Sequence, residues 1–469
     1  MLDTPRFKPS TTHLDLGSRF FQAVPAATFP RHEVRWRNPR WSAHVGLDTL
    51  SDDAWVRHFG QFEALPGSLP EPIALAYHGH QFRNYNPDLG DGRGFLFAQM
   101  IDPDDGRLLD FGTKGSGRTP WSRGGDGKLT LKGAVREILA TEMLEALGVN
   151  TSKTFSVIET GEALTRGDEP SPTRSAVLVR LSHGHIRIGS FQRHAFAGDQ
   201  DAIEVLTRHA AKHYFPDLDA GAPMGELAVA LVRRVADATA RTTADWTAAG
   251  FVHGVLNSDN INITGESFDY GPWRFLPEMD PKFTAAYFDD FGLYAFGRQP
   301  QAVLWNVSRL AECFTDFARE KDLSDALAGF DDAFNIALSS ALSRRLGIAA
   351  EDGLRLELGS RLLPTLLETR TPFENIFFDC YGGRDSVRKD IAQKTYAGTR
   401  LKSLVTELAT CAAAPNAKAE HPYFHGAAPC TLLIEEVEHI WDAISARDDW
   451  SVLQAKIDTI ETLKSAYGG

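Results

Sequence analysis

Hydrophobic residues in the first part of the chain come in short runs that glycines interrupt. Between about residues 75 and 127, the glycine-rich residues 90–94 lead into the apolar run 95–100, and the turn-forming residues 104–106 lead into a second run, 108–113. Short apolar runs bounded by Asp-Gly turns are typical of antiparallel strands. The pattern therefore predicts a β-rich segment here.

The hydrophobic period changes to that of a helix after residue 129. Leu131, Val135, Ile138 and Leu139 share one helical face, and Gly148 follows as a helix stop. Because the apolar side of this helix needs a partner surface, we expect it to pack on the preceding strands.

Two more strands and then a helix-rich region are predicted further along the chain. Residues 155–158 and 175–181 have the composition of strands, and the stretch 166–173 between them is polar and rich in turn residues. Helices are predicted over residues 202–249, and within this stretch residues 225–248 show alanine-rich amphipathic spacing. The fold class expected from this order is α+β.

Composition limits the classes of function. The chain has 469 residues, of which 43% are hydrophobic, so it can bury a large core and has room for two or three domains or lobes. A net charge of −13 argues against general binding to nucleic acid or an anionic membrane.

No apolar run is long enough for a signal sequence or a membrane span, so we expect a cytoplasmic protein. Four scattered cysteines predict reduced thiols rather than a zinc site or a disulfide scaffold.

The most informative polar residues surround one predicted loop. Asp259 and Asn260 follow His253 closely, and Asp269 lies nine positions after Asn260. A kinase-like catalytic loop needs a carboxylate near the attacking group, an amide oxygen for a metal ion and a second carboxylate on that metal. These three residues match those parts, so the pattern predicts a site that handles ATP.

A lysine and a glutamate are spaced for a second part of such a site. Lys114 ends a predicted strand, and Glu137 lies within the helix that follows. Kinase-like folds use such a pair to position a nucleotide phosphate. The alternative for Glu137 is a solvated acid on the helix surface. The segment is not a Walker loop, because it lacks Gly-x-x-x-x-Gly-Lys-Ser/Thr.

Three arginines occur in segments suited to anion binding. Arg93 lies within residues 90–94, where glycines let a backbone approach a ligand closely, although a plain turn has the same pattern. Arg180 and Arg187 are seven residues apart, at a predicted strand end and in the loop after it. They can therefore converge on one anion.

Four further polar residues resemble ligands, but we expect them to be structural. His183 and His185 have no cysteine or carboxylate at ligand spacing, which favours hydrogen bonding over metal binding. Asp110 and Asp290 begin Asp-Phe-Gly triplets. The first precedes the catalytic loop and the second lies 30 residues beyond Asn260, so neither fits the metal as well as Asp269 does.

Taken together, these segments resemble the selenoprotein O family of pseudokinase-like proteins. The resemblance covers roughly residues 33–315 and continues more faintly to about 380. It rests on Gly79-His80-Gln81-Phe82, Leu89-Gly90-Asp91-Gly92-Arg93, Lys114-Gly115-Ser116-Gly117-Arg118-Thr119-Pro120, Ser122-Arg123, Gly125-Asp126-Gly127, Arg136-Glu137, His185-Ile186-Arg187, His253-Gly254-Val255, Asn257-Ser258-Asp259-Asn260, Asp269-Tyr270-Gly271-Pro272, Leu304-Trp305-Asn306 and Arg309-Leu310.

The resemblance implies a two-lobed, protein-kinase-like (pseudokinase) fold. Its β-rich N-lobe would span 75–182 and its helical C-lobe 183–383, with an N-terminal extension at 1–74 packing on the lobes and a divergent helical region at 384–469. The resemblance also implies metal-dependent transfer of AMP from ATP to Ser, Thr or Tyr hydroxyls of proteins, self-modification included. Pyrophosphate would be released, and ATP would be bound in the reverse of the usual kinase orientation.

Residue roles are carried over from the matching motifs. Asp259 would be the proton acceptor, Asn260 and Asp269 would hold Mg²⁺ or Mn²⁺, and Glu137 would steady Lys114. The residues implied to hold the nucleotide are Gly90, Gly92, Arg93, Lys114, Asp126, Gly127, Arg180 and Arg187.

The chain also departs from the family pattern. The stretch 180–185 carries histidine and glycine where the family has a shorter variation, and the closing residues 464–469 contain no cysteine, so a redox role is not implied. Three alternatives stay open: uridylyl transfer from UTP with Mn²⁺, a nucleotide-binding pseudokinase regulator without turnover, and a conventional phosphotransferase. The joint presence of Asp259, Asn260 and Asp269 argues against the regulator, because a scaffold without turnover need not keep a base and metal ligands together.

Overall fold

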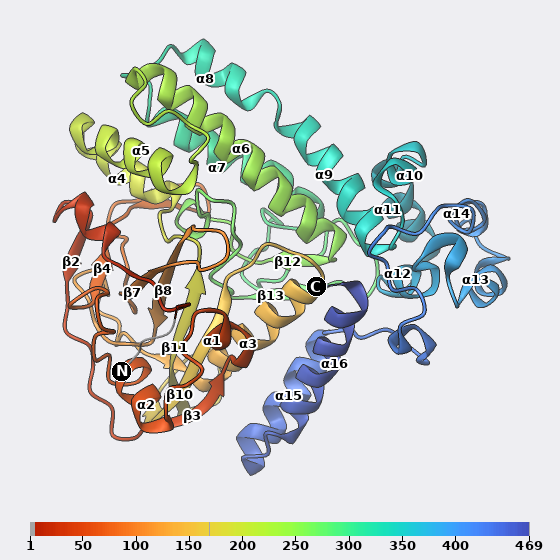
Figure 1. Cartoon of the computed structure of the whole chain (residues 1–469), viewed down its shortest axis with the longest axis horizontal. Helices are drawn as coiled ribbons and strands as arrows, with labels where there is room; N and C mark the ends of the chain where they lie inside the picture. The colour runs from red at the N-terminus through yellow and green to blue at the C-terminus, as the bar shows by residue number, and fades with distance from the viewer. Residues whose placement is uncertain (1–4, 168, 469) are drawn as a thin grey trace.

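An antiparallel β-sheet forms the first part of the molecule, and a helical region follows it (Figure 1). The structure, a computed structural model, describes residues 5–167 and 169–468. The strand order is β2 (Phe21–Ala23), β4 (Ile73–Leu75), β7 (Leu96–Ile101), β8 (Leu108–Lys114), β11 (Thr173–Ser182), β10 (Lys153–Leu164) and β3 (Glu33–Arg37). Two short strands extend it, β1 (Pro9–Ser10) beside β7 and β9 (Leu129–Thr130) beside β11.

The four strands predicted from apolar runs are confirmed. Strands β7 and β8 form an antiparallel hairpin, and the runs at 155–158 and 175–181 lie inside the longer β10 and β11. Strands β1, β2 and β3 come from the first 74 residues and pair within the same sheet. They contain only two to five residues each, too few for a two-residue period to be recognised.

Both faces of the sheet are covered. Val177 and Val179 of β11 belong to the same buried cluster as Trp55 of α2 (Asp52–Phe59), whereas Leu178 between them belongs to the cluster that contains α3 (Leu131–Ala146). This alternation is the period of a strand that is buried on both sides. Other elements near the sheet are α1 (Pro39–His44), η1 (Thr12–Leu16) and the hairpin β5 (Gly79–Gln81) and β6 (Asn84–Asn86).

Helix α3 confirms the helical period predicted after residue 129. Thr130 caps it, because its Oγ1 accepts a hydrogen bond of 3.1 Å from the backbone N–H of Gly133. The helix packs against β10 and β11, as its apolar face predicts. Glu137 lies on this packed face and is 1% exposed, so the structure excludes the alternative of a solvated acid.

The helical region follows the sheet directly. Its first helices are α4 (Ile188–Ala197), α5 (Gln200–Tyr214), α6 (Met224–Ala248), α7 (Gln299–Glu312), α8 (Glu320–Leu327) and α9 (Phe330–Arg345). The hairpin β12 (Phe251–His253) and β13 (Trp273–Phe275) lies after α6, with η2 (Ser258–Asn260) in its long loop and η3 (Phe296–Arg298) before α7. Helices α5 and α6 confirm the helices predicted within 202–249.

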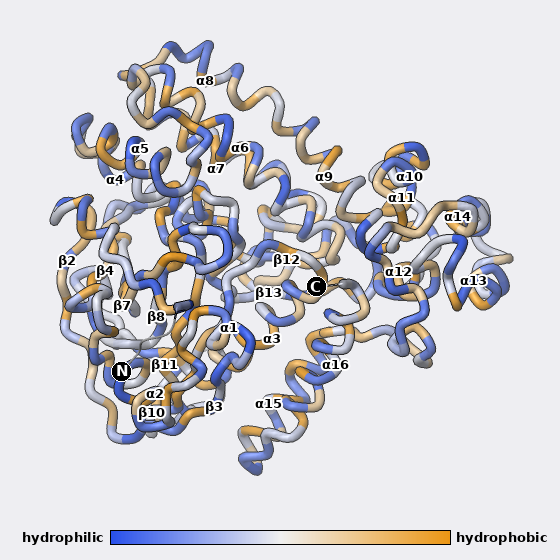
Figure 2. Tube along the Cα trace, in the orientation of Figure 1, coloured by the Kyte–Doolittle hydropathy of each residue, from blue (hydrophilic) through white to orange (hydrophobic). Residues whose placement is uncertain are grey.

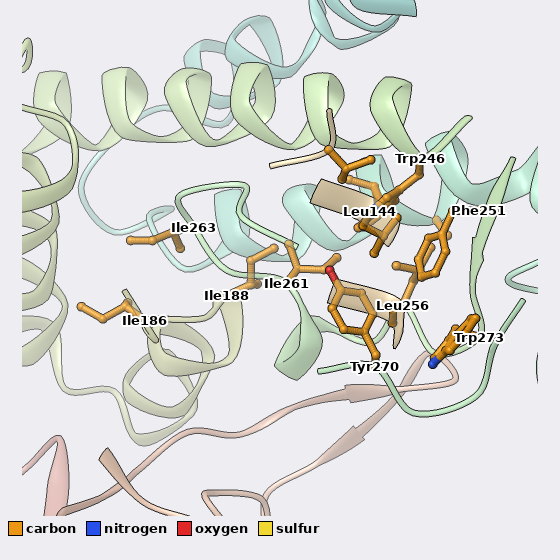
Figure 3. Close-up of a cluster of buried hydrophobic side chains, with 14 of the residues drawn as sticks. Leu144, Ile186, Ile188, Trp246, Phe251, Leu256, Ile261, Ile263, Tyr270 and Trp273 are labelled. Atoms are coloured by element: carbon orange, nitrogen blue, oxygen red, sulfur yellow. The ribbon is translucent and has the colours of Figure 1, made fainter. Parts of the chain in front are cut away.

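A large hydrophobic cluster supports the loop between β12 and β13. Figure 3 shows Leu256, Ile261 and Tyr270 of this loop gathered below the long helix α6, together with Trp246 and Phe251. All five residues are buried. Because apolar side chains anchor the loop at several points, the polar residues between them are held in fixed places.

The last part of the chain returns to the sheet side of the molecule. After α10 (Ala350–Arg355), α11 (Leu358–Thr369), α12 (Asn375–Cys380), η4 (Gly383–Asp385), α13 (Lys389–Tyr396), α14 (Lys402–Leu408) and η5 (Pro422–His425), the chain forms α15 (Ile434–Arg447) and α16 (Ser451–Tyr467). Figure 1 shows α16 beside α3, and the two helices pack together. Figure 2 shows apolar and polar residues alternating along α15 and α16, as in amphipathic helices.

The state of the four cysteines is the one predicted from the sequence. Cys313, Cys380, Cys411 and Cys430 are all free and buried, as expected of reduced thiols. Within residues 5–167 and 169–468, every helix is too short or too polar to cross a lipid bilayer.

Packing of α16 on α3 gives a testable prediction. Leu463 of α16 is fully buried in the cluster that contains α3, so Leu463→Ala should lower the free energy of unfolding by about 2–5 kcal/mol. The matched control Leu367→Ala removes a half-exposed side chain and should cost less than about 1 kcal/mol. Urea denaturation followed by tryptophan fluorescence and by circular dichroism measures both. The packing would be contradicted if, in Leu463→Ala, the C-terminal helices unfolded in a separate transition while the free energy of unfolding of the rest of the protein stayed unchanged.

Candidate active site

A cavity of about 650 Å³ lies between the sheet and the loop that connects β12 and β13. The structure brings all but one of the residues predicted for the site to this cavity. They are Gly90, Gly92, Arg93, Lys114, Asp126, Gly127, Arg180, Arg187, Asp259, Asn260 and Asp269. The exception, Glu137, lies behind the cavity wall and contacts it through Lys114. What each residue binds stays a prediction, but their convergence from distant segments is a property of the fold.

Lys114 joins three elements at the cavity wall. It ends β8, and its Nζ donates a hydrogen bond to Glu137 of α3. The same Nζ lies 2.9 Å from Oδ1 of Asp269, in the loop between β12 and β13. Because Lys114 and Glu137 are buried, each charge needs the other to offset the loss of hydration. The pair therefore locks the sheet to the helix.

Asp269 is the most strongly held carboxylate of the site. Its backbone has a φ of 61°, a left-handed conformation that is uncommon for a residue other than glycine. Arg180 Nη1 lies 3.4 Å from Oδ1, in addition to Lys114. Burial alone would raise the pKa of Asp269, but the charges of Lys114, Arg180 and Arg93 hold it well below its usual range. Asp269 is therefore ionised whenever the site is folded near neutral pH.

Asp259 is less completely satisfied. It lies on η2 and is buried, with Gln81 Nε2 donating to Oδ2 at 3.4 Å. Its other oxygen, Oδ1, is buried without a hydrogen-bond partner among the described residues. Burial raises the pKa of Asp259 to about 6. A buried, unpartnered carboxylate oxygen at a cavity wall is available to accept a proton from a ligand.

Asn260 presents its amide oxygen rather than its amide nitrogen. Its Nδ2 donates to the backbone carbonyl of Val255 at 3.1 Å, which leaves Oδ1 as the free end of the side chain. Carboxylate and amide oxygens are the donors that Mg²⁺ and Mn²⁺ prefer. The side-chain oxygens of Asn260 and Asp269, which both line the cavity, are therefore of the kind that fits such a cation.

Two buried arginines line the same cavity. Arg187 Nη1 donates to Asp91 Oδ1 at 3.0 Å, and its guanidinium lies 4.1 Å from the ring centre of Tyr77. Its Nε is buried without a hydrogen-bond partner in the described part of the chain. Arg180 is buried too, and its Nε donates to His185 at 3.3 Å. Both groups are held rigidly and retain unused donors, as an anion site requires.

The glycine-rich residues 90–94 pack under a second loop. A Cβ on Gly90 would lie 2.3 Å from the ring of Trp121, so only glycine fits there. Arg93 is exposed at the mouth of the cavity. Asp126 also lines the mouth, but Arg166 binds its carboxylate in a two-pronged ion pair of 2.8 and 3.1 Å. A nucleotide would have to contact Asp126 through its backbone or displace Arg166.

Both histidines are hydrogen-bonded, as the sequence predicts. His185 accepts from Arg180 through Nε2, and its Nδ1 lies 3.4 Å from Asp110. His183 is placed between Glu266 at 3.2 Å and Asp102 at 3.3 Å, and although burial lowers its pKa, the two carboxylates raise it to about 9. One ligand atom from each of Asp102, Asp105 and His183 lies within 4.8 Å of the others, a grouping that could hold a metal ion, so the prediction that no carboxylate lies at ligand spacing from His183 is wrong in the folded chain. Folding brings together carboxylates that were not visible at ligand spacing in the sequence.

The two Asp-Phe-Gly aspartates do not line the cavity. Asp110 is fully buried in β8 and accepts a hydrogen bond of 2.7 Å from Gln99 Nε2. Asp290 is exposed, and its neighbour Asp289 caps the following turn by accepting from the backbone N–H of Tyr294 at 2.8 Å. Asp269 is therefore the only one of the three candidate aspartates that reaches the cavity.

Several residues of the cavity were not predicted. They include Tyr77, Gln81, Asp91, Trp121, Arg166 and Asn257. Asp91 and Gln81 lie within two of the motifs that carry the family resemblance, so the sequence did indicate that both residues are close to the site. Arg166 is part of the turn-rich stretch 166–173, where nothing in the local sequence points to Asp126 across the cavity mouth.

Comparison with known proteins gives a consistent result. The model of the family "Protein adenylyltransferase SelO" matches residues 6–461. A protein of Synechocystis sp. named "Protein nucleotidyltransferase YdiU" is 40% identical over 96% of this chain and 96% of its own length. Proteins with the same name are 49% identical in Synechococcus elongatus, over 75% of this chain and 70% of theirs, and 41% identical in Rhodopseudomonas palustris, over 67% and 65%.

These matches extend beyond the range in which motifs were recognised from the sequence. The family model covers the N-terminal strands and the first 11 of the 17 residues of α16, whereas the resemblance recognised from motifs covers roughly residues 33–315 and continues more faintly to about 380. Since the match spans almost the whole chain and its relatives carry the same name, the chain belongs to the SelO family and is a nucleotidyltransferase.

Proposed function

We propose that this enzyme transfers AMP from ATP to Ser, Thr or Tyr hydroxyls of proteins, itself included, and releases pyrophosphate. The site would lie between the two lobes of a kinase-like fold, with the sheet and α3 as one lobe and the helices from α4 onward as the other. The Lys114–Glu137 pair, the loop with Asp259 and Asn260, and Asp269 support this likeness.

The observation that carries the proposal is the pair of buried arginines, Arg180 and Arg187, on the cavity wall. Buried guanidinium groups with unused donors stabilise phosphate oxygens and offer little to a neutral base. Arg93 and Asp126 lie instead at the open mouth. The triphosphate tail would therefore enter first and the base would stay near the mouth, which is the reverse of the usual kinase orientation.

In this orientation the α-phosphorus would be the phosphorus that faces Asp259. The acceptor hydroxyl gives its proton to the free Oδ1 of Asp259 as its oxygen bonds to the α-phosphorus. The bond from that phosphorus to the bridging oxygen of the β-phosphate breaks, and pyrophosphate leaves. Lys114, Arg180 and Arg187 offset its charge. A divalent cation held by Asn260 and Asp269 would supply further positive charge to the phosphoryl oxygens.

The identity of the transferred group is the first test. Parallel incubations with α-labelled and γ-labelled ATP should label the chain itself and added acceptor proteins only from the α-position. Asp259→Asn should reduce labelling by ~10² or more, because the proton acceptor is lost. Intact-mass analysis should show adenylate on the parent chain, and UTP in place of ATP tests uridylyl transfer. Labelling from γ-labelled ATP with ADP as product would refute the proposal.

The second test separates the metal ligand from the phosphate ligand. Asp269→Asn should abolish the gain in ATP affinity that Mg²⁺ or Mn²⁺ provides, whereas Lys114→Met should weaken ATP binding with and without the cation. Asp290→Asn is the matched control, because its side chain is exposed and lies outside the cavity. Calorimetric titration with ATP measures each case. An unchanged metal dependence in Asp269→Asn would rule out its assignment as a ligand.

The third test concerns the positioning of Lys114. Glu137→Gln keeps the size of the side chain but removes the charge that holds Lys114 from behind, so kcat/KM should fall about 10- to 100-fold. Glu142→Gln is the control on the same helix. Its carboxylate contacts Asn38 and Arg40 instead of the cavity, so it should alter thermal stability and leave kcat/KM within about twofold. Equal losses of activity in both variants would contradict a specific role of Glu137.

A further inference from the structure

A second groove adjoins the active-site cavity. It has a volume of about 400 Å³ and is lined by residues of α3, β9 and the segment 270–288. Arg93, Lys114, Lys128 and Arg166 border both the groove and the cavity. A molecule in the groove would therefore lie next to a bound nucleotide without occupying its place.

The groove is strongly basic. Seven lysines and arginines line it against two glutamates, on a chain whose net charge is −13, although carboxylates in or beside the groove form ion pairs with Lys114, Lys128, Lys132 and Arg166. The basic residues are Arg93, Lys114, Lys128, Lys132, Arg136, Arg166 and Arg274. A local positive surface on an otherwise acidic protein attracts a negatively charged partner.

Three of these arginines form no ion pair among the described residues, and two of them, Arg136 and Arg274, also lie outside the lining of the nucleotide cavity. Arg136 Nη2 and Arg274 Nη1 both donate to the backbone carbonyl of Trp273, at 3.2 and 3.0 Å. Among the described residues, neither guanidinium has a carboxylate within ion-pair distance, in contrast to Lys132, which lies 2.7 Å from Glu438. Burial and the neighbouring charge of Arg274 lower the pKa of Arg136 to about 10. Two adjacent cations with unused donors form a ready site for a carboxylate.

Aromatic side chains form the rim of the groove. Tyr287 and Phe288 are 82% and 45% exposed. Phe288 contacts the ring of Phe82 at 5.8 Å between ring centres, and the backbone N–H of Phe82 donates to Asn257 at 3.1 Å. Asn257 lies two residues before Asp259, so the rim leads from the groove towards the proposed proton acceptor.

We propose that this groove docks an acidic segment of the acceptor polypeptide. Arg136 and Arg274 would bind its Asp or Glu side chains, and Tyr287 and Phe288 would pack against its backbone and apolar atoms. The charge of the groove selects the acidic segment, and the exposed aromatic rim fits a polypeptide better than a bare polyanion. The inference rests on the proposed transfer to protein hydroxyls, and it adds a preference among acceptors.

Binding and transfer are measured separately, so that the two proposals can fail independently. The probes are a fluorescent serine peptide flanked by glutamates and the same peptide with glutamines in place of the glutamates. Fluorescence anisotropy without ATP should show that the parent enzyme binds the acidic peptide at least about tenfold more tightly. With ATP, the acidic peptide should also have the lower KM for adenylate transfer.

The double variant Arg136→Gln/Arg274→Gln removes the two unpaired cations of the groove that do not also line the nucleotide cavity. We expect affinity for the acidic peptide to fall about tenfold, with affinity for the neutral peptide and for ATP unchanged. The control Arg233→Gln/Arg241→Gln removes the same charge from exposed positions of α6 and should leave all affinities unchanged. Tyr287→Ala tests the rim without disturbing the core and should weaken binding of both peptides about two- to threefold.

The outcomes discriminate clearly. Equal binding of the two peptides by the parent enzyme, or equal loss in the two double variants, would overturn the docking proposal. A single-stranded oligonucleotide of the same charge that competes as well as the acidic peptide would overturn the assignment to a polypeptide. Tight, charge-dependent binding of the acidic peptide without adenylate transfer would support docking while refuting the proposed function.

Discussion

The buried contact of Lys114 with Glu137 and Asp269 is the interaction on which the site depends. Its three members come from a strand, a helix and a loop that are distant in sequence. Removing charges from water is costly, so such a group is stable only when the surrounding structure fixes its geometry. Sheet packing, the cap of α3 and the apolar anchors of the loop supply that geometry. In the proposed function, this contact would hold Lys114 in place before a nucleotide phosphate binds.

The C-terminal helices contribute to this geometry from outside the cavity. Lys464 of α16 lies 2.9 Å from Glu145 of α3, which also binds Arg40 at 2.6 Å. Burial raises the pKa of Glu145, but the nearby cations Lys153, Arg40 and Lys464 hold it well below its usual range. Helix α3 is thus clamped between the sheet and α16, and Glu137 has little freedom to move away from Lys114. The C-terminal helices, in which no family motif was recognised, therefore still help to keep Glu137 of α3 in position.

Much of the fold and the site was predictable because it depends on local patterns. Apolar runs bounded by turn residues predicted the long strands, a helical period predicted the helices, and the spacing of Asp259, Asn260 and Asp269 predicted the loop that carries them. Features set by long-range packing were not predictable. The ion pair between Arg166 and Asp126 joins residues 40 positions apart, and the carboxylates around His183 come from other segments. Such contacts follow from the tertiary fold, which no short window of sequence encodes.

The first Asp-Phe-Gly triplet illustrates how a misleading motif can still serve the site. Asp110 is too far inside the sheet to bind a ligand, yet it lies beside His185, and His185 accepts a hydrogen bond from Arg180. An imidazole whose Nε2 accepts from Arg180 carries its proton on Nδ1, facing Asp110. The carboxylate therefore favours the tautomer that orients the arginine. Motif matching alone would assign Asp110 to a metal ion. Its contacts instead show that it supports Arg180 through His185. A buried charge can therefore influence a site through a residue that it contacts, without contacting the ligand itself.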